Sequence, residues 1–314
     1  MSKVFVTVRG YLNNPTIIIV DLLRKKEIER IEVDVDFPFN IENHKKGFSG
    51  ICIEDNIVYC ATWDRIVCLE ESTLNKINEY TSPYFSDLHG IYKHKNILFV
   101  TSTNLSSLLA LNLHTGKVSV VFSYTGFSID KKTENDFRKL RKHDIPYYQE
   151  HLNSVHVNNK SIWISTLRLN RKLRLSEKLR LIRYEKPGSI TKINIDTFEV
   201  ENIVYNEGFH DPKFYDECLF YTQYFSNSLL KINVNTLHKN VISLGLEQQV
   251  NKRVTTRGMI KHHDVYYVGH NVKREYLRTM QSGFIGVYDS TGKKIDDNIV
   301  IKGVTGIYDI VIND

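Results

Sequence analysis

The sequence predicts an all-β fold, a single six-bladed β-propeller that uses the whole chain, residues 1–314. Three observations predict it. A four-residue signature recurs six times, each of the first five copies is followed by short apolar strands separated by turns, and the sixth copy reaches the end of the chain after one strand. Repeated units of four short strands are typical of propellers.

The signature consists of an apolar or small residue, a variable residue, a small or turn residue, and usually an apolar residue. Its copies lie at 48–51, 88–91, 152–155, 209–212, 256–259 and 304–307. The fourth copy fits most loosely, because Pro212 takes the apolar position. A β-sandwich is the alternative fold, but it needs no signature before every fourth strand.

Apolar strands follow each of the first five signatures. In the first repeat, Ile57–Cys60 reads as a second strand and Ile66–Leu69 as a third. Turns such as His114–Lys117 then lead to a fourth strand in later repeats. Runs of this length between turn residues predict hairpin meanders.

The N-terminus supplies the strands that the sixth repeat lacks. Val4–Val8, Thr16–Val20 and Glu27–Val33 read as second, third and fourth strands. We therefore expect a sixth blade made of 304–314 plus 3–33, in which the C-terminal strand pairs with the N-terminal strands. Such sharing closes the ring and removes an open sheet edge.

Composition narrows the class of protein. Hydrophobic residues make up 41% and charged residues 25%, which is ordinary for a soluble domain. No apolar run reaches the roughly 18 residues of a membrane helix, and the first residues lack the features of a secretory signal. We therefore expect a cytoplasmic protein, with no membrane partner and free thiols on its four cysteines.

Three of the cysteines, Cys52, Cys60 and Cys68, fall on neighbouring predicted strands. A zinc site is one interpretation of this group. Burial as small hydrophobic side chains is the interpretation that we favour.

The net charge of +6 is concentrated in one segment. Between Arg168 and Lys186 there are eight Lys or Arg residues and two Glu residues, so the rest of the chain is neutral. Nucleic-acid binders spread basic charge over a face, so we expect no nucleic-acid partner.

Two insertions, 125–150 and 167–186, are expected to rise from the face that carries the site. The first contains a helix-like run, Glu134 to Lys142. The leucines of the second are all odd-numbered and so share one face of extended strands, which predicts a long basic β-hairpin. It is either a solvated or self-associating arm, which would make a homo-oligomer, or a lid that guides an anionic substrate.

The variable signature position predicts a ring of polar side chains at the channel mouth. One comes from each blade, in the order Ser49, His89, Asn153, His210, Arg257 and Thr305. Convergent polar groups in a concave place favour a ligand site over a solvated rim.

The residue types in this ring suggest roles. Arg257 suits a carboxylate or phosphate. His89 and His210 could exchange protons near neutral pH, and Asn153 could orient the substrate or stabilise an oxyanion. These three are the candidate catalytic residues, while Arg257, Ser49 and Thr305 are candidate substrate-binding residues.

Residues outside the ring complete the predicted site. His151 precedes the first strand of the third blade. The loops between second and third strands bring Trp63, Gln223 and His270 to the same rim. We expect no cofactor. One divalent metal at the ring centre, held by His89, His210 and His151, is the alternative, although Arg257 would repel it.

The chain resembles a poorly characterised family of bacterial proteins that are predicted to be six-bladed propellers. The residues that carry the resemblance span about half the chain: His151–Val155, His210–Pro212, Thr256–Gly258, Val268–Asn271 with Arg274 and Glu275, and Val304–Asp309. This chain departs from the family at Asp211, where a small polar residue is common, and in its 168–186 insertion.

That resemblance implies the fold but no reaction. The architecture is more distantly similar to gluconolactonases, which hold a divalent metal at the ring centre, but a shared fold does not transfer a function.

These observations favour an enzyme that acts on an anionic small molecule or sugar derivative by hydrolysis, lyase chemistry or isomerisation. The alternative is a non-catalytic propeller that binds a peptide, glycan or protein partner on the same face.

Overall fold

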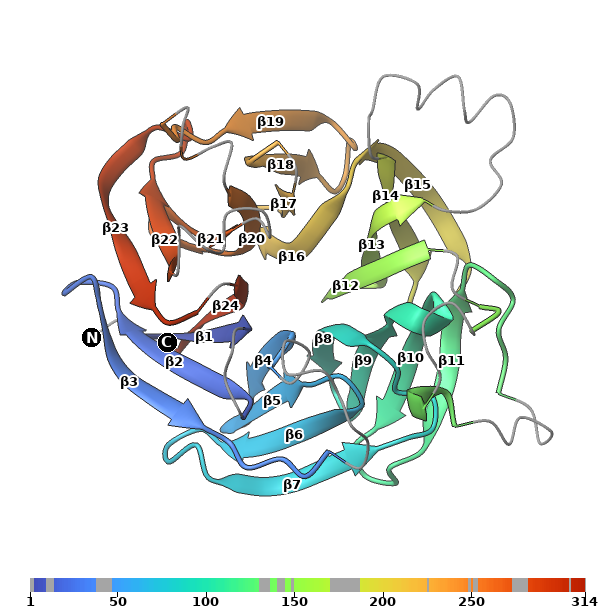
Figure 1. The fold of residues 1–314 in the computed structure, drawn as a ribbon. Helices are drawn as coiled ribbons and strands as arrows, with labels where there is room; N and C mark the ends of the chain where they lie inside the picture. Colours follow the sequence, from blue (N-terminus) through green and yellow to red (C-terminus); the bar gives the residue numbers. More distant parts are fainter. Residues whose placement is uncertain are drawn as a thin grey trace.

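Six four-stranded sheets stand around a central axis among the described residues of this chain (Figure 1). The computed structural model describes residues 3–9, 14–37, 47–129, 136–139, 145–147, 150–169, 187–224, 226–247, 250, 254–272, 282–304 and 306–313. Neighbouring strands within each sheet are antiparallel. The predicted fold class, a six-bladed β-propeller, is confirmed.

Each blade runs outward from the channel in chain order. The first three blades are β4 (Gly50–Glu54), β5 (Ile57–Ala61), β6 (Arg65–Glu70) and β7 (Lys76–Thr81); β8 (Leu88–His94), β9 (Ile97–Ser102), β10 (Ser107–Asn112) and β11 (Val118–Ser123); and β12 (Glu150–Asn158), β13 (Ser161–Leu169), β14 (Pro187–Asn194) and β15 (Val200–Glu207). The next two are β16 (Phe209–Tyr215), β17 (Cys218–Gln223), β18 (Ser228–Asn233) and β19 (Lys239–Ser243); and β20 (Val254–His262), β21 (Val265–Val272), β22 (Ser282–Tyr288) and β23 (Lys294–Lys302).

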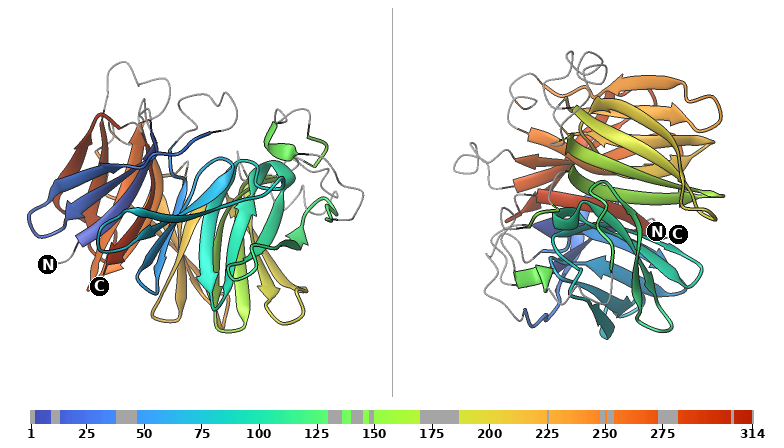
Figure 2. Two further views of the ribbon diagram at one scale, coloured as in Figure 1. Left: turned by 90° about the horizontal axis from the view of Figure 1, so that it is seen from below. Right: turned by 90° about the vertical axis from the view of Figure 1, so that its right-hand side faces the viewer.

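The sixth blade joins the two ends of the chain. It contains β24 (Gly306–Asn313), β1 (Lys3–Arg9), β2 (Thr16–Asp21) and β3 (Lys26–Glu32), in that order from the channel. β1 pairs with β24 from Lys3 opposite Asn313 to Arg9 opposite Gly306. The predicted closure is therefore confirmed, and the two termini lie close together (Figure 2).

The hydrophobic core is divided among the contacts between neighbouring blades. For example, one cluster joins Val6 of β1 to Ile260 of β20 and Ile285 of β22, and another joins Phe5 to Val58 of β5. Middle strands have a neighbouring blade on both faces, which is why β2 and β17 are buried throughout. This explains the continuous apolar runs in the sequence, since strands covered on both faces do not alternate.

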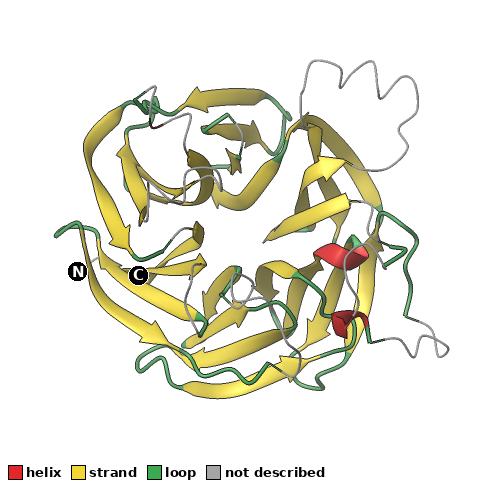
Figure 3. Ribbon diagram, viewed as in Figure 1, coloured by secondary structure: helices red, strands yellow, loops and turns green. Residues whose placement is uncertain are grey.

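The outermost strands face solvent. β3, with the sequence KEIERIE, has no fully buried residue, and β7 shows the same pattern. Charged residues on such edges discourage pairing with another molecule. Figure 3 shows how little helix accompanies the strands: two single turns of 3-10 helix, η2 (Thr103–Leu105) and η3 (Phe137–Lys139), are described.

The repeated signature corresponds to a β-bulge near the start of four of the six innermost strands. The register with the second strand shifts between Leu88 and Ile91 in β8, and equivalent shifts occur in β12, β16 and β20, whereas the shift of β24 comes later, between Ile307 and Asp309. A bulge adds one residue and redirects a side chain. In these four blades the bulge is how the variable residue of the signature comes to face the channel end.

The small residue of the signature is needed because the innermost strands approach one another closely. A Cβ atom added to Gly50 would lie 2.2 Å from the His89 carbonyl oxygen. One added to Gly90 would lie 2.5 Å from the Ser154 Cα. The signature is thus a packing requirement at the ring centre as well as a position for polar groups.

The described part of the first insertion packs on the second blade. The hydroxyl of Ser86 donates to the carbonyl oxygen of Phe137 at 2.9 Å, and that of Ser106 donates to the carbonyl oxygen of Tyr147 at 2.9 Å. Phe127, Phe137 and Ile145 form a small apolar cluster with Leu105 of η2. Of the predicted helix-like run from Glu134 to Lys142, the described portion contains η3.

The predicted basic hairpin falls on residues outside the described ranges, apart from its two ends. β13 ends at Leu169 and β14 begins at Pro187. The hairpin and the oligomer that it would support remain predictions.

Two further observations bear on the sequence predictions. In the described ranges no helix is long and apolar enough to cross a membrane. All four cysteines are free; Cys60 and Cys68 are buried in apolar clusters, and burial raises the pKa of the Cys68 thiol to about 12. The favoured interpretation of these cysteines as buried hydrophobic side chains is confirmed for this pair.

Candidate functional site

The polar signature residues converge at one end of the channel. Ser49, His89, Asn153, His210 and Arg257 lie at the bulges or just before the innermost strands, and each is 5% exposed or less. Charge interactions link His210 with Arg257, His89 and His151, which shows that the residues of successive blades are close in space. Thr305, the sixth predicted member of the ring, lies outside the described residues.

The loops between second and third strands reach the same end of the channel. The Leu88 amide donates to the Trp63 carbonyl oxygen at 3.1 Å, and the Tyr224 amide donates to the Gly208 carbonyl oxygen at 3.2 Å. Each loop therefore touches the start of an innermost strand, as predicted from the direction of the strands.

Ser49 connects the first two blades. Its hydroxyl lies 2.6 Å from the Leu88 carbonyl oxygen and 3.2 Å from the Ala61 carbonyl oxygen. The hydroxyl has one hydrogen and both carbonyl oxygens only accept, so Ser49 donates this hydrogen to the protein backbone.

His89 is oriented by its own strand. Nδ1 lies 2.9 Å from the Leu88 carbonyl oxygen, which can only accept, so Nδ1 carries the hydrogen and Nε2 is the nitrogen that can take up a proton. The carboxylate of Asp87 lies 3.6 Å from Nδ1. The His151 ring meets the His89 ring edge to face, with 5.2 Å between centroids.

Asn153 has a fixed orientation, because both ends of its amide have partners. Nδ2 donates to the Phe209 carbonyl oxygen at 2.8 Å, while Oδ1 accepts from the Ser165 hydroxyl at 3.0 Å. Nδ2 also lies 3.2 Å from Nε2 of His210. The amide therefore presents a hydrogen to that nitrogen, and Nε2 of His210 accepts it.

The Asn153 contact determines the tautomer of His210. Since Nε2 accepts, the neutral ring carries its hydrogen on Nδ1, which is buried and has no acceptor among the residues that the structure describes. Burial, followed by the charge of Arg257, holds the pKa of His210 well below its usual range, so the ring is neutral at physiological pH. The Tyr224 ring covers one side of it, at 5.3 Å between centroids.

Arg257 is the fixed charge of the site. Its guanidinium carbon lies 3.7 Å from the centre of the Tyr308 ring, which is close enough for a cation–π contact. Within the described part of the chain it forms no ion pair, and its buried Nε has no acceptor. Burying a cation without a counter-ion is costly, so this arrangement is suited to receive an anion.

The other predicted rim residues are buried against protein partners. Gln223 accepts a hydrogen bond from the Ser228 hydroxyl at 2.7 Å. His270 stacks on Phe284 inside the fifth blade, and its Nε2 lies 2.9 Å from the Tyr288 hydroxyl. The structure therefore does not bring His270 to the ring. Trp63 is nearly buried beside the start of β8, and the ligand-binding roles of these three residues remain predictions.

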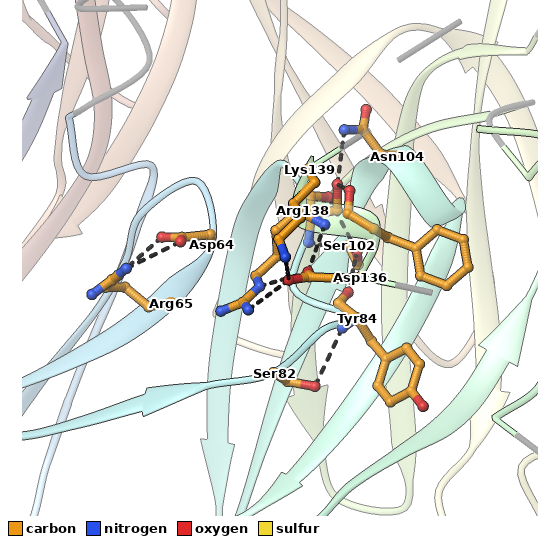
Figure 4. A network of polar contacts seen from close by, with 11 residues as sticks. Asp64, Arg65, Ser82, Tyr84, Ser102, Asn104, Asp136, Arg138 and Lys139 are labelled. Carbon is orange, nitrogen blue, oxygen red and sulfur yellow. Dashed lines mark hydrogen bonds and ion pairs between the residues drawn. The ribbon is translucent and has the colours of Figure 1, made fainter. Parts of the chain in front are cut away.

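The rim of the first two blades is held by a polar network (Figure 4). Arg65 pairs with Asp64 through two hydrogen bonds of 2.9 and 3.1 Å and with Glu79 at 2.7 Å. Arg138 of η3 pairs with Asp136 at 2.7 Å. Unlike Arg257, these arginines form ion pairs with other described residues.

Asp211 is a buried residue of the site whose role was not predicted from the sequence. This residue has a left-handed φ of 52°, is 7% exposed, and its Oδ2 accepts the Gly258 amide hydrogen at 2.7 Å. Burial and the neighbouring Asp309 raise its pKa to about 7, against the opposing charges of Arg257 and Lys213. The only sequence signal was the departure from the signature of the resembled family at this position.

Below the ring, the channel contains a cavity of about 250 Å³. Its polar lining includes Asp211, His156 and the ion pair of Lys213 with Asp309, at 2.9 Å. The ring of signature residues and this cavity are thus two successive levels of one channel, and Asp211 lies between them.

The ring residues do not fit a divalent metal well. The one nitrogen of His210 with a free electron pair already accepts from Asn153, and Arg257 adds a fixed positive charge. No group of three or more His, Cys, Asp or Glu side chains with metal-binding geometry occurs among the described residues. The donor set is better suited to an anion than to a cation.

Solved structures similar to this chain are propellers of distant sequence. A protein of unknown function from Bacteroides caccae matches with a TM-score of 0.62 at 11% identity, over 99% of this chain and 98% of that one. A chain of a nidogen/laminin complex matches with a TM-score of 0.61 at 12% identity, over 99% and 97%. The computationally designed Ika8 protein matches with a TM-score of 0.50 at 12% identity, over 95% and 90%.

At this level of identity the likeness concerns the fold alone. No protein family model and no curated protein sequence matches the chain. The similarity to a propeller of unknown function is in line with the resemblance to poorly characterised propeller proteins.

Proposed function

We propose that this propeller is an enzyme that binds an anionic small molecule or sugar derivative at the ring of signature residues. One observation carries the proposal: two buried donors, Nε–H of Arg257 and Nδ1–H of His210, have no acceptor within the described residues. Each would gain a hydrogen bond from a carboxylate or phosphate oxygen, and buried donors left unpaired are rare.

The two donors differ in kind, which suits one anionic group with two oxygens. Arg257 supplies the charge, and neutral His210 supplies a second hydrogen bond without competing for a proton. Asn153 acts as a positioning residue, because its contact at 3.2 Å keeps the hydrogen of His210 on Nδ1.

His89 is the residue that we assign to proton transfer. The Leu88 carbonyl holds its Nδ1–H, and Asp87 stands 3.6 Å from the same nitrogen. This arrangement places the hydrogen of the neutral ring on Nδ1, so Nε2 is the nitrogen through which His89 would act as a general base. Proton abstraction of this kind serves hydrolysis, elimination and isomerisation, the three reaction types predicted from the sequence. The free cysteines suit the cytoplasmic setting that we propose.

The experiment is a binding screen followed by a turnover assay. A panel of carboxylates, phosphate esters and sugar acids is tested by thermal shift, and the best compounds are measured by calorimetry on the wild type, Arg257→Gln and His210→Phe. We expect loss of binding in both variants and normal binding in Arg65→Gln, whose guanidinium is already paired.

The same compounds then distinguish an enzyme from a binding protein. Turnover that disappears in His89→Ala while binding persists supports catalysis. Binding without turnover for every compound favours the alternative, a propeller that binds a peptide, glycan or protein partner. A panel in which no anion binds the wild type contradicts the proposal.

A further inference from the structure

The cavity below the ring is a separate compartment of the channel. The innermost strands β4, β8, β12, β16, β20 and β24 all contribute to its wall, and none of the five described ring residues does. Its volume of about 250 Å³ exceeds the roughly 150 Å³ of an engineered cavity that binds benzene. It can therefore hold a small organic molecule.

The wall of the cavity is apolar over much of its area. Ile51, Ile91, Val155, Ile260 and Ile310 line it, and all are buried. Glu54, whose side chain is 45% exposed, lies at the end where the cavity meets solvent. A ligand would enter past a carboxylate and lie against aliphatic side chains.

The charged groups inside favour a cation. Lys213 and Asp309 neutralise each other in an ion pair at 2.9 Å. Asp211 remains as a third charged group, and it has no ion-pair partner among the described residues. Its Oδ2 is occupied by the Gly258 amide, while no described donor lies within hydrogen-bond distance of Oδ1.

Asp211 is poorly compensated where it stands. Burial and Asp309 raise the pKa of its carboxyl to about 7, although Arg257 on the ring side and Lys213 on the cavity side act against this. A cation in direct contact with Oδ1 would compensate the ionised carboxylate better than these two groups do.

A second buried polar group faces the same space. His156 is 9% exposed, lines the cavity, and forms no hydrogen bond with the described residues. Its ring packs between Tyr92, at 4.5 Å between centroids, and Phe214, at 6.3 Å. Burial and Lys213 lower its pKa to about 3, so it is neutral and does not repel a cation.

We propose that this cavity is a binding site for a small protonated amine with an apolar body. The ammonium group binds Oδ1 of Asp211, and the apolar body lies against the aliphatic wall and the Tyr92–His156 rings. The Asp211 carboxylate repels an anionic ligand, and a neutral ligand supplies no counter-charge to it. This proposal does not rest on the function proposed for the ring.

Calorimetry with three probes of nearly equal shape tests the proposal: benzylamine, benzyl alcohol and benzoate, added to the full-length protein at pH 8. We expect benzylamine to bind at least tenfold more tightly than benzyl alcohol, and benzoate not to bind. Asp211→Asn is expected to weaken benzylamine binding at least tenfold. Asp55→Asn, the same change at an exposed carboxylate outside the cavity lining, should leave it unchanged.

A measurement on the wild type covers the case in which Asp211→Asn fails to fold. Benzylamine affinity should fall below pH 7 as Asp211 becomes protonated, approaching tenfold per pH unit. Equal affinity for benzyl alcohol, undiminished binding in Asp211→Asn, binding of benzylamine that ignores pH between 8 and 5, or no binding of benzylamine would each overturn the proposal. Failure of the anion screen on Arg257 does not affect these outcomes. That screen uses anions that would bind at the ring, whereas benzylamine is a cation that would bind in the cavity below it.

Discussion

Nδ2 of Asn153 lies 3.2 Å from Nε2 of His210, and this hydrogen bond joins the innermost strands of the third and fourth blades. The amide can only donate at that end, since Oδ1 is held by the Ser165 hydroxyl. The free hydrogen of His210 is therefore directed away from Asn153, on the nitrogen that has no acceptor. His210 and Arg257 thus each present a buried donor that has no acceptor among the described residues.

Removing the charge of Arg257 should not destabilise the ligand-free protein. Arg257→Gln eliminates a buried cation without an ion-pair partner in the described chain, at the cost of its contact with Tyr308. We expect an unchanged or higher Tm. Arg65→Gln, by contrast, leaves Asp64 buried without its partner and should cost about 3 kcal/mol. Thermal and urea unfolding of both variants check this, and a large loss of stability in Arg257→Gln would show that Arg257 is structurally paired.

Anion affinity at the ring should decrease as the pH rises through about 7. The pKa of Asp211 is raised to about 7, so above that pH its carboxylate is charged and competes for Arg257. We expect a decrease of about fivefold between pH 6 and 8, the lower end of common coupling energies. His89 and His151 face the same site, so the test is a comparison of the wild type with Asp211→Asn, which should lose most of this decrease. Identical pH profiles of the two proteins would show that ionisation of Asp211 does not affect anion binding.

Buried neutral histidines should make the fold sensitive to acid. The pKa values of His156 and His270 are lowered to about 3 in the folded state, mainly by burial, against an ordinary value near 6.5. Between pH 6.5 and 3 the unfolded chain therefore binds protons that the folded chain does not, and stability is lost as the pH falls. At pH 5 each histidine costs about 2 kcal/mol relative to pH 7.

The change His270→Phe removes one of these groups. We expect the free energy of unfolding of this variant to fall less between pH 7 and 5 than that of the wild type. Asp211, whose pKa is raised, acts in the opposite direction in both proteins, so the difference between them isolates the histidine. Urea titrations at several pH values measure it, and parallel curves would contradict burial of a neutral ring.

Close packing at the ring centre should make Gly90 hard to replace. The Cβ of Gly90→Ala would meet the backbone of Ser154 at 2.5 Å, so we expect a loss of about 3 kcal/mol. Gly116→Ala is the control: nothing lies within 4 Å of the added Cβ, so the change costs only what its left-handed φ of 70° imposes, about 1 kcal/mol. Equal effects of the two changes in urea unfolding would reject the packing explanation of the signature.

The fold followed from the sequence because close packing of the innermost strands favours a small residue at the same position of several blades. Gly50 and Gly90 meet the next innermost strand at similar distances, so the signature repeats wherever that contact repeats. The polar ring was predictable for the same reason, since equivalent positions in successive blades converge.

Other features of the site depend on details that a repeat pattern does not contain. The sequence places His270 in a rim loop, but the strand β21 continues to Val272 and takes His270 into the blade, where Tyr288 is its partner. The role of Asp211 depends on a left-handed backbone at a bulge followed by Pro212, which turns the carboxylate toward Gly258. Neither outcome follows from hydrophobic periodicity, because both depend on local backbone geometry.

Anion binding by Arg257 together with His210 can be observed in a high-resolution crystal structure of the protein as purified and after a soak with the tightest carboxylate from the screen. We predict density for an anionic group with oxygens within about 3 Å of Nε of Arg257 and Nδ1 of His210. A carboxylate of the chain itself on Arg257, or a ring that still holds only water after the soak, would contradict the claim.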